Sequence, residues 1–251
     1  MKPGQIRRIG LARALSKAGY CSRSRAAELI RGGHVSLNGK ISRNPETPVS
    51  GDRDRIAVDG KGIEAQSRIY VMMNKPRGVV TTAADEKGRE TVYALLNAQK
   101  NNSLWLAPVG RLDKASEGLL LLTNDSEWGA RIAAPETHLD KTYHVQVGTV
   151  ADDQFVQLLL RGVKAQGEVL RAKKARRLHA GQKNCWLELV LDEGKNRQIR
   201  RMMEAMGVEV LRLIRVAIGP LQLGNLAKGA HRALTADEKR MLDRALQKFN
   251  K

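Results

Sequence analysis

The 251-residue chain has little cysteine and no long hydrophobic run. Its two cysteines, Cys21 and Cys185, are far apart and belong to no Cys-x-x-Cys pair, so neither a disulfide framework nor a zinc site is predicted. The apolar run 118–122 is far shorter than the roughly 20 residues that cross a bilayer. Residues 1–8 are charged, but they are not followed by the apolar segment that a secretory signal contains. We therefore expect a cytoplasmic protein without a membrane span and without a metal.

Acidic residues are in deficit. The chain has 26 Asp and Glu against 44 Lys and Arg, which gives a formal net charge of +18. Cations that displace condensed counterions from phosphates supply sequence-independent affinity, so nucleic acid is the predicted partner, ahead of an anionic membrane surface. Aromatic residues are scarce too, with 2 Phe, 3 Trp and 4 Tyr. Because few rings are available to stack on single-stranded bases, recognition of RNA shape and phosphates is favoured.

The strongest charge bias lies in residues 1–43, which contain ten basic side chains and one acid. Glycine and serine positions predict a helix over 11–18, a second helix over 26–30 that is entered from Ser22 or Ser24, and a strand over 35–37. Asn38-Gly39 follows, and this pair favours the type I′ turn of a hairpin. The segment is therefore predicted to be a small αα-β docking unit.

Basic side chains of this unit can form one cationic face for a phosphate backbone. Arg13 and Lys17 are four residues apart on the first predicted helix, and like charges at this spacing repel unless an anion binds. A generally basic surface and a helix-turn-helix for duplex DNA are the alternatives. The predicted RNA-binding residues are Arg13, Lys17, Arg23, Arg25, Arg31 and Lys40.

The composition changes near Gln66, where the short polar segment 60–67 gives way to an apolar strand over 69–73. We place a domain boundary there, which gives domains 8–66 and 67–251. In the second domain, the patterns predict strands over 104–109, 119–123, 143–147 and 186–191, and helices over 126–134, 152–160, 196–206 and 235–249. Thr235 and Glu238 have the spacing of a capping box. The predicted fold class is α+β.

One aspartate lies in a turn between two apolar segments, in the sequence Val109-Gly-Arg-Leu-Asp113. Taken alone, an aspartate near a strand end is more often a cap or a turn residue than a catalytic group. Whether Asp113 is interpreted as a catalytic group therefore depends on the other motifs of the chain.

Several segments resemble known families. The runs 12–19, 21–25, 27–30 and 33–39 resemble the small S4-type RNA-binding domain. Gly-Arg-Leu-Asp at 110–113 resembles the catalytic motif of the bacterial ribosomal RNA pseudouridine synthases of the Rsu/Rlu family. Three further segments resemble other motifs of that family, namely Asn-Lys-Pro-Arg-Gly-Val-Val-Thr at 74–81, Lys-Thr-Tyr-His-Val-Gln-Val at 141–147 and Glu-Gly-Lys-Asn-Arg-Gln-Ile-Arg-Arg-Met at 193–202.

The resemblance implies a small N-terminal RNA-binding domain followed by a mixed, mainly antiparallel catalytic sheet flanked by helices. It also implies isomerisation of a uridine in ribosomal RNA, without a cofactor, by Asp113 as nucleophile or as base on the sugar. Tyr143 would pack against the flipped base, and Arg111 would fill the vacated space or hold a phosphate. A partly desolvated aspartate needs a guanidinium to stay ionised. By motif position Arg200 is the candidate for this partner, and Arg197 is the second.

Several alternatives stay open. Lys75 is predicted to lie in a short basic turn, where a solvated contact to the RNA backbone is as well supported as a chemical role. The predicted partner is ribosomal RNA or a pre-ribosomal particle, bound by a monomer. The character of residues 185–232 favours the large-subunit RNA over the small-subunit RNA. A non-catalytic RNA-binding assembly factor is the competing class, and a DNA-binding regulator would leave the C-terminal two-thirds without a role.

Overall fold

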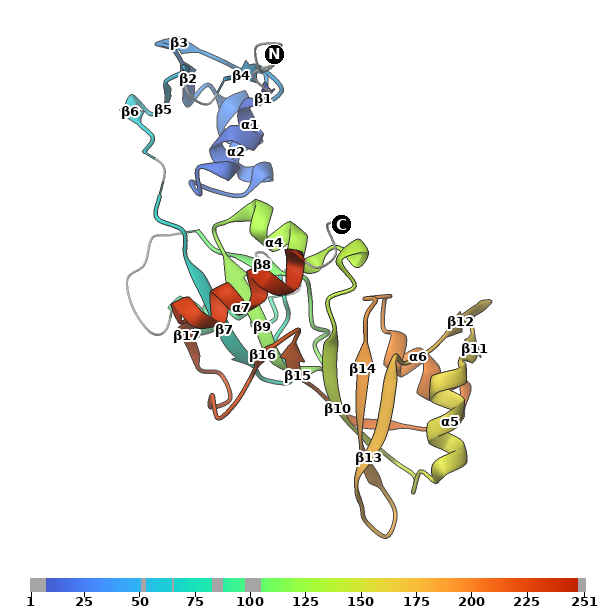
Figure 1. The fold of residues 1–251 in the computed structure, drawn as a ribbon. Coiled ribbons are helices and arrows are strands. Elements are labelled where there is room, and N and C mark those ends of the chain that lie inside the picture. The colour runs from blue at the N-terminus through green and yellow to red at the C-terminus, as the bar shows by residue number, and fades with distance from the viewer. Residues whose placement is uncertain (1–7, 51–52, 65, 83–87, 98–104, 248–251) are drawn as a thin grey trace. The chain divides into compact units, whose positions relative to one another are not determined.

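A computed structural model describes residues 8–50, 53–64, 66–82, 88–97 and 105–247 of the chain. The contacts within the chain divide it into two units, whose elements are labelled in Figure 1. Unit 1 consists of Met1–Tyr70, Asn102–Ala107 and Thr123–Gly129. Unit 2 consists of Val71–Asn101, Pro108–Leu122 and Ala130–Lys251.

Unit 1 is built from two short helices and a small sheet. Its first elements are β1 (Ile9–Gly10), α1 (Leu11–Lys17) and α2 (Arg23–Gly32). The strands that follow are β2 (Val35–Leu37), β3 (Lys40–Ile41), β4 (Pro48–Val49), β5 (Ile56–Val58) and β6 (Lys61–Gly62). β1 pairs with β4, and the other strands form an antiparallel sheet in the order β3-β2-β5-β6. Both predicted helices and the predicted strand are therefore confirmed.

Local signals set the ends of these elements. The hydroxyl of Ser22 accepts a hydrogen bond from the backbone N–H of Arg25 at 3.1 Å, so α2 begins after Ser22 rather than after Ser24. Gly33 ends α2 in the left-handed conformation. Asn38 and Gly39 both have positive φ, 52° and 80°, as a type I′ turn requires. The predicted hairpin between β2 and β3 is confirmed by this turn and by the pairing of the strands.

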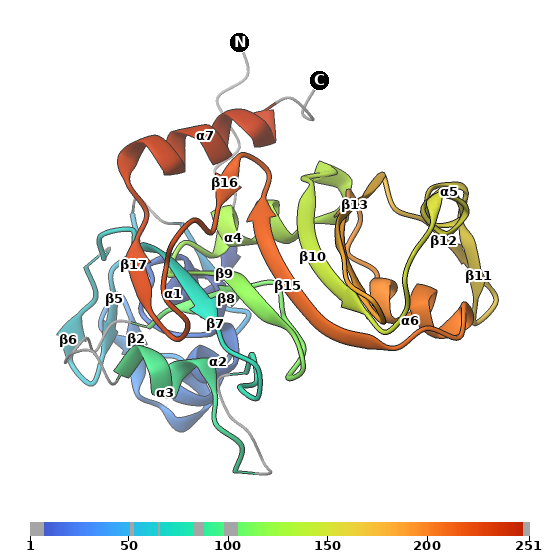
Figure 2. The same cartoon turned by 90° about the horizontal axis from the view of Figure 1, so that it is seen from below.

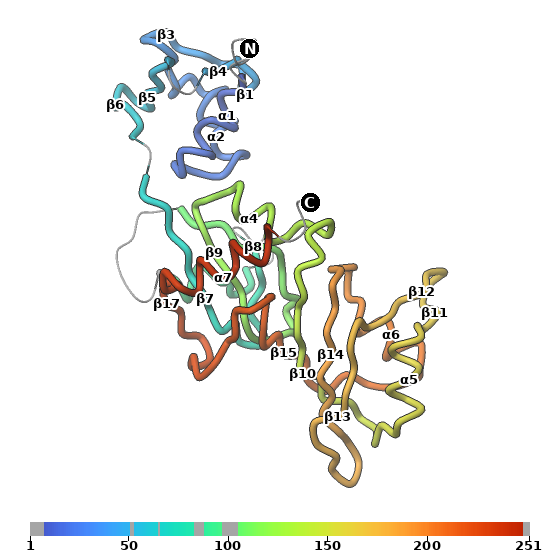
Figure 3. Tube along the Cα trace, viewed as in Figure 1, coloured from blue at the N-terminus to red at the C-terminus, as the bar shows by residue number. Residues whose placement is uncertain are grey.

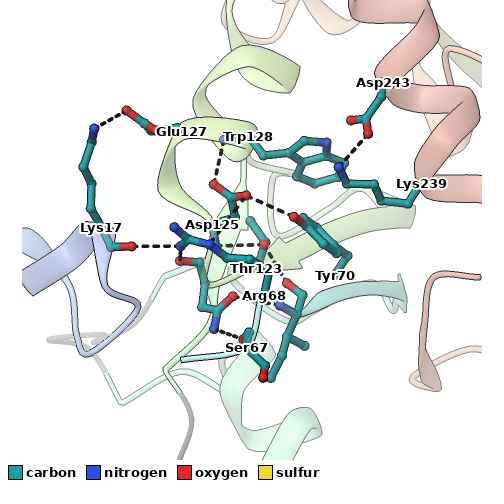
Figure 4. A network of polar contacts seen from close by, with 12 residues as sticks. Lys17, Ser67, Arg68, Tyr70, Thr123, Asp125, Glu127, Trp128, Lys239 and Asp243 are labelled. Carbon is teal, nitrogen blue, oxygen red and sulfur yellow. Dashed lines mark hydrogen bonds and ion pairs between the residues drawn. The ribbon is translucent and has the colours of Figure 1, made fainter. Parts of the chain in front are cut away.

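A polar network joins segments of unit 1 that are distant in sequence (Figure 4). Arg68 Nη1 donates to the backbone oxygen of Lys17 at 2.8 Å. Tyr70 Oη donates to Asp125 Oδ2 at 3.0 Å. The ammonium of Lys17 also lies 2.5 Å from Glu127 Oε1. Through these contacts, residues 123–129 are linked to the end of α1.

Unit 2 contains most of a nine-stranded sheet. The strands are β7 (Tyr70–Lys75), β8 (Ala107–Val109), β9 (Glu117–Thr123), β10 (Lys141–Val147), β13 (Lys174–Ala180), β14 (Cys185–Leu191), β15 (Val210–Ile218), β16 (Leu221–Gln222) and β17 (His231–Ala233). Their order is β13-β14-β10-β15-β9-β7-β17, with β16 beside β15 and β8 beside β9. β15 and β9 are parallel, whereas the pairs β13/β14, β14/β10, β10/β15, β15/β16 and β7/β17 are antiparallel. The predicted mixed, mainly antiparallel sheet is confirmed.

The remaining elements are helices and one short hairpin. The helices are α3 (Val92–Asn97), α4 (Ser126–Ala133), the 3₁₀ turn η1 (Pro135–Thr137), α5 (Asp153–Arg161), α6 (Gln198–Ala205) and α7 (Ala236–Gln247), and the hairpin consists of β11 (Val163–Ala165) and β12 (Glu168–Leu170). The predicted capping box of α7 is present, because the Thr235 N–H donates to Glu238 Oε2 at 2.8 Å and the Glu238 N–H donates to Thr235 Oγ1 at 3.2 Å. None of the described helices is long and apolar enough to cross a membrane.

α5 and α6 cover one face of the sheet. In Figure 2 both helices lie on the same side of the curved strands β10, β13 and β15. Leu159 of α5 and Met202 of α6 belong to a buried cluster with Val145 of β10, Leu189 of β14 and Leu213 of β15. Because side chains alternate along a strand, positions two residues from Val145 and Leu213 point to this same face. Part of the candidate site lies at these positions.

The strand prediction is incomplete in unit 2. Neither β13 nor β15 is predicted, although β15 is one of the central strands and runs over nine residues. The hairpin of β13 and β14, traced in Figure 3, ends the sheet on one side. Of the predicted segments 104–109 and 235–249, Leu104 and residues 248–249 lie outside the described residues.

Candidate active site

Asp113 lies in the loop that connects β8 to β9, and its side chain is 38% exposed. The loop is braced by the segment that follows β7. The hydroxyl of Thr81 donates to the backbone oxygen of Leu112 at 2.9 Å, and the Gly78 N–H donates to the backbone oxygen of Lys114 at 2.8 Å. Leu112 is itself buried. The residues on both sides of Asp113 are therefore held in place while its carboxylate stays accessible.

A cleft of about 310 Å³ opens beside Asp113 in unit 2. Two of the residues predicted to bind substrate, Arg111 and Tyr143, line it together with Asp113. The cations that line the cleft are Arg111, Lys141, Lys195, Arg197 and Arg215, and Asp113 is the only carboxylate among its described lining residues. The cleft therefore combines one acid with an excess of positive charge.

The cation that contacts Asp113 is Arg197, whose Nη1 lies 3.5 Å from Asp113 Oδ2. Arg197 has φ +48° and stands at the N-cap of α6, so its side chain leaves the helix just before the first turn. The Arg197 side chain is 52% exposed. A pair this long and this exposed contributes little stability. Its main effect is to place a positive charge beside the carboxylate.

Arg200 lies one turn further along α6, and its Nη2 donates to the backbone oxygen of Ala115 at 3.0 Å. Burial lowers the pKa of the Arg200 guanidinium, the charge of Arg197 adds to this effect, and Asp113 opposes it. Through this contact with the backbone of Ala115, the Arg200 side chain braces the loop that carries Asp113. The hypothesis that Arg200 is the direct partner of the Asp113 carboxylate stays a prediction, since Arg197 makes the described contact.

The interpretation of Lys75 as a solvated residue in a basic turn is wrong. Lys75 ends strand β7 and is 0% exposed. Its ammonium donates to the backbone oxygens of Pro76 at 2.9 Å and Val79 at 2.7 Å, so it holds the loop after β7 in shape. Burial lowers the pKa of Lys75 to about 8, although Asp113 and Glu117 oppose this effect. Lys75 follows the apolar run Val71–Met73 by two residues, and this position near the end of an apolar strand was the available signal for its burial.

Arg215 lines the same cleft and is absent from the sequence-based set of candidates. It is 6% exposed, and its Nε donates to the backbone oxygen of Leu119 at 2.7 Å. It stands directly opposite Tyr143 in the pairing of β15 with β10. An arginine at an inward position of the alternating run Val210–Ile218 was the signal that could have identified it.

Gly118 allows the strand after Asp113 to pass close to Arg215. It has φ +103°, a region that residues with a side chain rarely adopt. A Cβ atom at this position would lie 2.3 Å from the backbone oxygen of Arg215. Since Gly118 and Arg215 face each other in the parallel pair of β9 and β15, only glycine fits there. This close approach brings the Asp113 loop and Arg215 to one cleft.

The six predicted RNA-binding residues all lie in unit 1. Arg13, Arg23, Arg31 and Lys40 are exposed and have no described carboxylate partner. Lys17 pairs with Glu127 at 2.5 Å, and Arg25 pairs with Glu28 at 3.0 Å. Four of the six cations are therefore free to meet phosphates without first breaking an ion pair.

Within the described part of the chain, no group of three or more His, Cys, Asp or Glu side chains is arranged to hold a metal ion. Cys21 and Cys185 are both buried free thiols.

Known proteins provide an independent comparison. Residues 69–205 match the family model described as RNA pseudouridylate synthase, and residues 9–56 match the S4 domain. Ribosomal large subunit pseudouridine synthase B of Bacillus subtilis (strain 168) is 37% identical over 243 residues, which cover 96% of this chain and 98% of that protein. An uncharacterised RNA pseudouridine synthase of Aquifex aeolicus (strain VF5) is 34% identical and covers 95% of both chains. A crystal structure of a pseudouridylate synthase matches with a TM-score of 0.65 and 30% identity, over 93% of this chain and 99% of that one.

Proposed function

The chain belongs to the family of RNA pseudouridylate synthases and carries an S4 domain, and from this premise we propose that it isomerises a uridine of ribosomal RNA, with Asp113 as the catalytic residue. Membership makes it an RNA-modifying isomerase. The ribosomal target is supported by the similarity along nearly the whole chain to a relative named for the large ribosomal subunit. We propose the large-subunit RNA, free or in a pre-ribosomal particle, as the substrate of a monomeric enzyme.

The observation that carries the assignment of Asp113 is its place as the only carboxylate among the described residues of a cationic cleft. Pseudouridine formation breaks the bond from uracil N1 to ribose C1′ and joins C5 to C1′ instead. The sugar becomes electron-deficient in this step, so an ionised carboxylate at the sugar either bonds to C1′ as nucleophile or removes a sugar proton as base. The reaction leaves the composition of the RNA unchanged, and we propose no cofactor.

The other cleft residues take supporting roles in this proposal. The target nucleotide must leave its stack before it reaches Asp113, and this costs a few kcal/mol that new contacts must offset. Tyr143 packs against the extruded uracil, and Arg111 fills the vacated space or holds a neighbouring phosphate. Arg197 places a positive charge beside the carboxylate, and Arg200 holds the loop that carries it.

The S4 domain supplies affinity for the RNA backbone in this proposal. We place the boundary between the RNA-binding and catalytic domains near Gln66, which gives domains 8–66 and 67–251. The exposed cations on the helices and the hairpin support this division of labour, since phosphate contacts fix position and carry no sequence information.

The test is release of tritium from RNA labelled at uracil C5, with free large-subunit RNA, free small-subunit RNA and partly assembled particles as substrates. We expect release from large-subunit material and none with Asp113→Asn, while RNA affinity stays within a fewfold. Undiminished release by the variant would refute the role of Asp113. Release from small-subunit RNA alone would refute the proposed target. Tight RNA binding without release from any substrate would favour a non-catalytic assembly factor.

A further inference from the structure

The cleft contains two groups of cations that differ in burial. Arg111, Lys195 and Arg197 are exposed, and this suits phosphates that stay in contact with water. Arg215 is 6% exposed, and Lys141 from the neighbouring strand β10 is only partly exposed. The less exposed pair, Arg215 and Lys141, is therefore better suited to a base that has left water than to the RNA backbone.

Arg215 has hydrogen-bonding capacity that the described residues do not use. Its Nε is fixed by the backbone oxygen of Leu119 at 2.7 Å, whereas its Nη2 is buried and has no hydrogen-bond partner in the described structure. A buried donor without an acceptor is unfavourable, and because Arg215 lines the cleft, a ligand bound there can supply the acceptor. Leu119 holds the guanidinium in place in advance of that ligand.

The positive charge around Arg215 is concentrated. Burial lowers the pKa of Lys141, and the repulsion from Arg215 is the second cause. Arg215 also contributes to the lowered pKa of Lys75. Arg215 therefore lies within electrostatic reach of two lysines, and an anion in the cleft would relieve the repulsion among them.

Glycosidic cleavage produces such an anion. When the N1–C1′ bond breaks, its electron pair stays with uracil, and the negative charge spreads from N1 over the oxygens O2 and O4. The ribose side is left electron-deficient and is stabilised by Asp113. C5 then forms the new bond to C1′ and loses its proton, while N1 gains a proton, so no oxidant, reductant or co-reactant is required.

We propose that Arg215, with Lys141 beside it, stabilises the negative charge that develops on the departing uracil. This inference rests on the proposed function. In it Asp113 stabilises the electron-deficient sugar, and Arg215 stabilises the negative charge on the base. Tyr143 stands opposite Arg215 in the strand pairing, so a uracil packed on Tyr143 lies within reach of the guanidinium. Donors that are held in place before charge develops stabilise a transition state more than the ground state.

The experiment compares two leaving groups. Oligoribonucleotides that span the uridine mapped by tritium release are made with uridine or with 5-fluorouridine at the target, and loss of the N-glycoside is followed in single turnovers by digestion and mass spectrometry. Fluorine withdraws electrons and makes the departing uracil anion less basic. We expect Arg215→Gln to slow cleavage at uridine by about 10²–10³-fold, as for loss of one preorganised donor. At 5-fluorouridine we expect a loss at least about tenfold smaller, because this anion needs less stabilisation.

A matched control is available on α6. Arg201 is also a largely buried arginine, 14% exposed, and its Nη2 donates to the backbone oxygen of Ala165 at 3.2 Å, but it does not line the cleft. We expect Arg201→Gln to change the rates of the two substrates by the same factor. Equal slowing of both substrates by Arg215→Gln, or no slowing of either, would overturn the inference.

Further variants keep the test decisive. If Arg215→Gln does not fold, Arg215→Lys and Lys141→Gln undergo the same comparison, and each is expected to slow the uridine substrate more than the fluorinated one. Equal slowing by these variants contradicts the inference. Absence of tritium release by the wild-type enzyme from every ribosomal RNA and particle contradicts the proposed function. Normal wild-type turnover with variants whose slowing does not depend on the leaving group contradicts only the role of Arg215.

Discussion

We expect Gly118→Ala to destabilise unit 2. The φ of +103° at Gly118 costs a residue with a side chain about 1–3 kcal/mol. The added Cβ would lie 2.3 Å from the backbone oxygen and 2.8 Å from the backbone nitrogen of Arg215, so relief requires β9 and β15 to separate. Overpacking of this kind costs about 1–3 kcal/mol more. The sum, about 2–6 kcal/mol, is a large share of the 5–15 kcal/mol typical of a folded protein.

The assay is urea unfolding followed by far-ultraviolet circular dichroism, with hydrogen exchange of the peptides that contain β9 and β15 as the local readout. Gly207→Ala is the matched control. Gly207 also has positive φ, +68°, but nothing lies within 4 Å of the position of its Cβ. The control therefore carries only the backbone cost, about 1–2 kcal/mol. The difference between the two variants therefore reports the contact between the strands together with any extra backbone cost of the φ of +103° at Gly118.

A loss of stability in Gly118→Ala no larger than in Gly207→Ala would refute the close approach of β9 and β15. Turnover offers a second readout at temperatures where the variant is still folded. Separation of the strands moves Arg215 relative to the Asp113 loop, and small displacements of reacting groups reduce rates strongly. We expect turnover to fall about tenfold or more, and full turnover with intact folding would contradict this reasoning.

Three further predictions concern Lys75, Thr81 and the cations of unit 1. Because Lys75 has a folded pKa of about 8 against an ordinary 10.5, the unfolded chain binds more protons between these values, and stability from this residue rises with pH. Urea titrations give the difference in unfolding free energy between wild type and Lys75→Met. After allowance for screening, this difference should increase by about 1–2 kcal/mol between pH 7 and pH 9.5. A difference that does not change with pH would contradict the burial of the charge. Thr81→Val removes both hydrogen bonds between Thr81 and Leu112. The single-turnover rate should fall about tenfold, while the unfolding free energy falls by only about 1 kcal/mol. An unchanged rate would show that catalysis does not need these hydrogen bonds to the Asp113 loop. Replacing four exposed cations with glutamine should reduce the slope of log affinity against log salt by about 0.7–0.9 for each phosphate that the variant no longer neutralises, and an unchanged slope would show that this face does not touch RNA. The four positions are Arg13, Arg23, Arg31 and Lys40.

Elements whose signals are local could be predicted from the sequence. The start of α2 depends on the hydroxyl of Ser22, and the hairpin turn depends on the positive φ of Asn38 and Gly39. The capping box at Thr235 is likewise a contact between residues three positions apart. In each case one or two side chains decide the conformation of their own backbone, so no knowledge of distant residues is needed.

The features that were missed depend on partners far away in the sequence. β15 gains its stability from β10 and β9, and although the alternating pattern indicates an inward position for Arg215, the groups that it meets there depend on those neighbouring strands. The burial of Lys75 likewise results from the place of β7 in the sheet, between β9 and β17. Motif position pointed to Asp113 and Tyr143, which do line one cleft, but it favoured Arg200 over Arg197, whereas Arg197 makes the described contact with Asp113. Arg197 stands at the N-cap of α6 with a left-handed backbone, and its Nη1 lies 3.5 Å from Asp113 Oδ2, an arrangement that motif position alone does not reveal.

The position of β13 at the end of the sheet has a consequence for handling the protein. Among the described strands only β14 pairs with it, so one side of a seven-residue strand offers unpaired N–H and C=O groups. Such an edge is a template for strand pairing between copies, and lysine or arginine along it is a common protection. Lys174 and Arg177 provide that charge here, whereas Arg176 pairs with Glu188 of β14 at 2.6 Å. Concentrated salt is the usual means of removing RNA from a basic protein. It screens the repulsion between the β13 strands of two copies and would therefore promote self-association through β13 during such a purification.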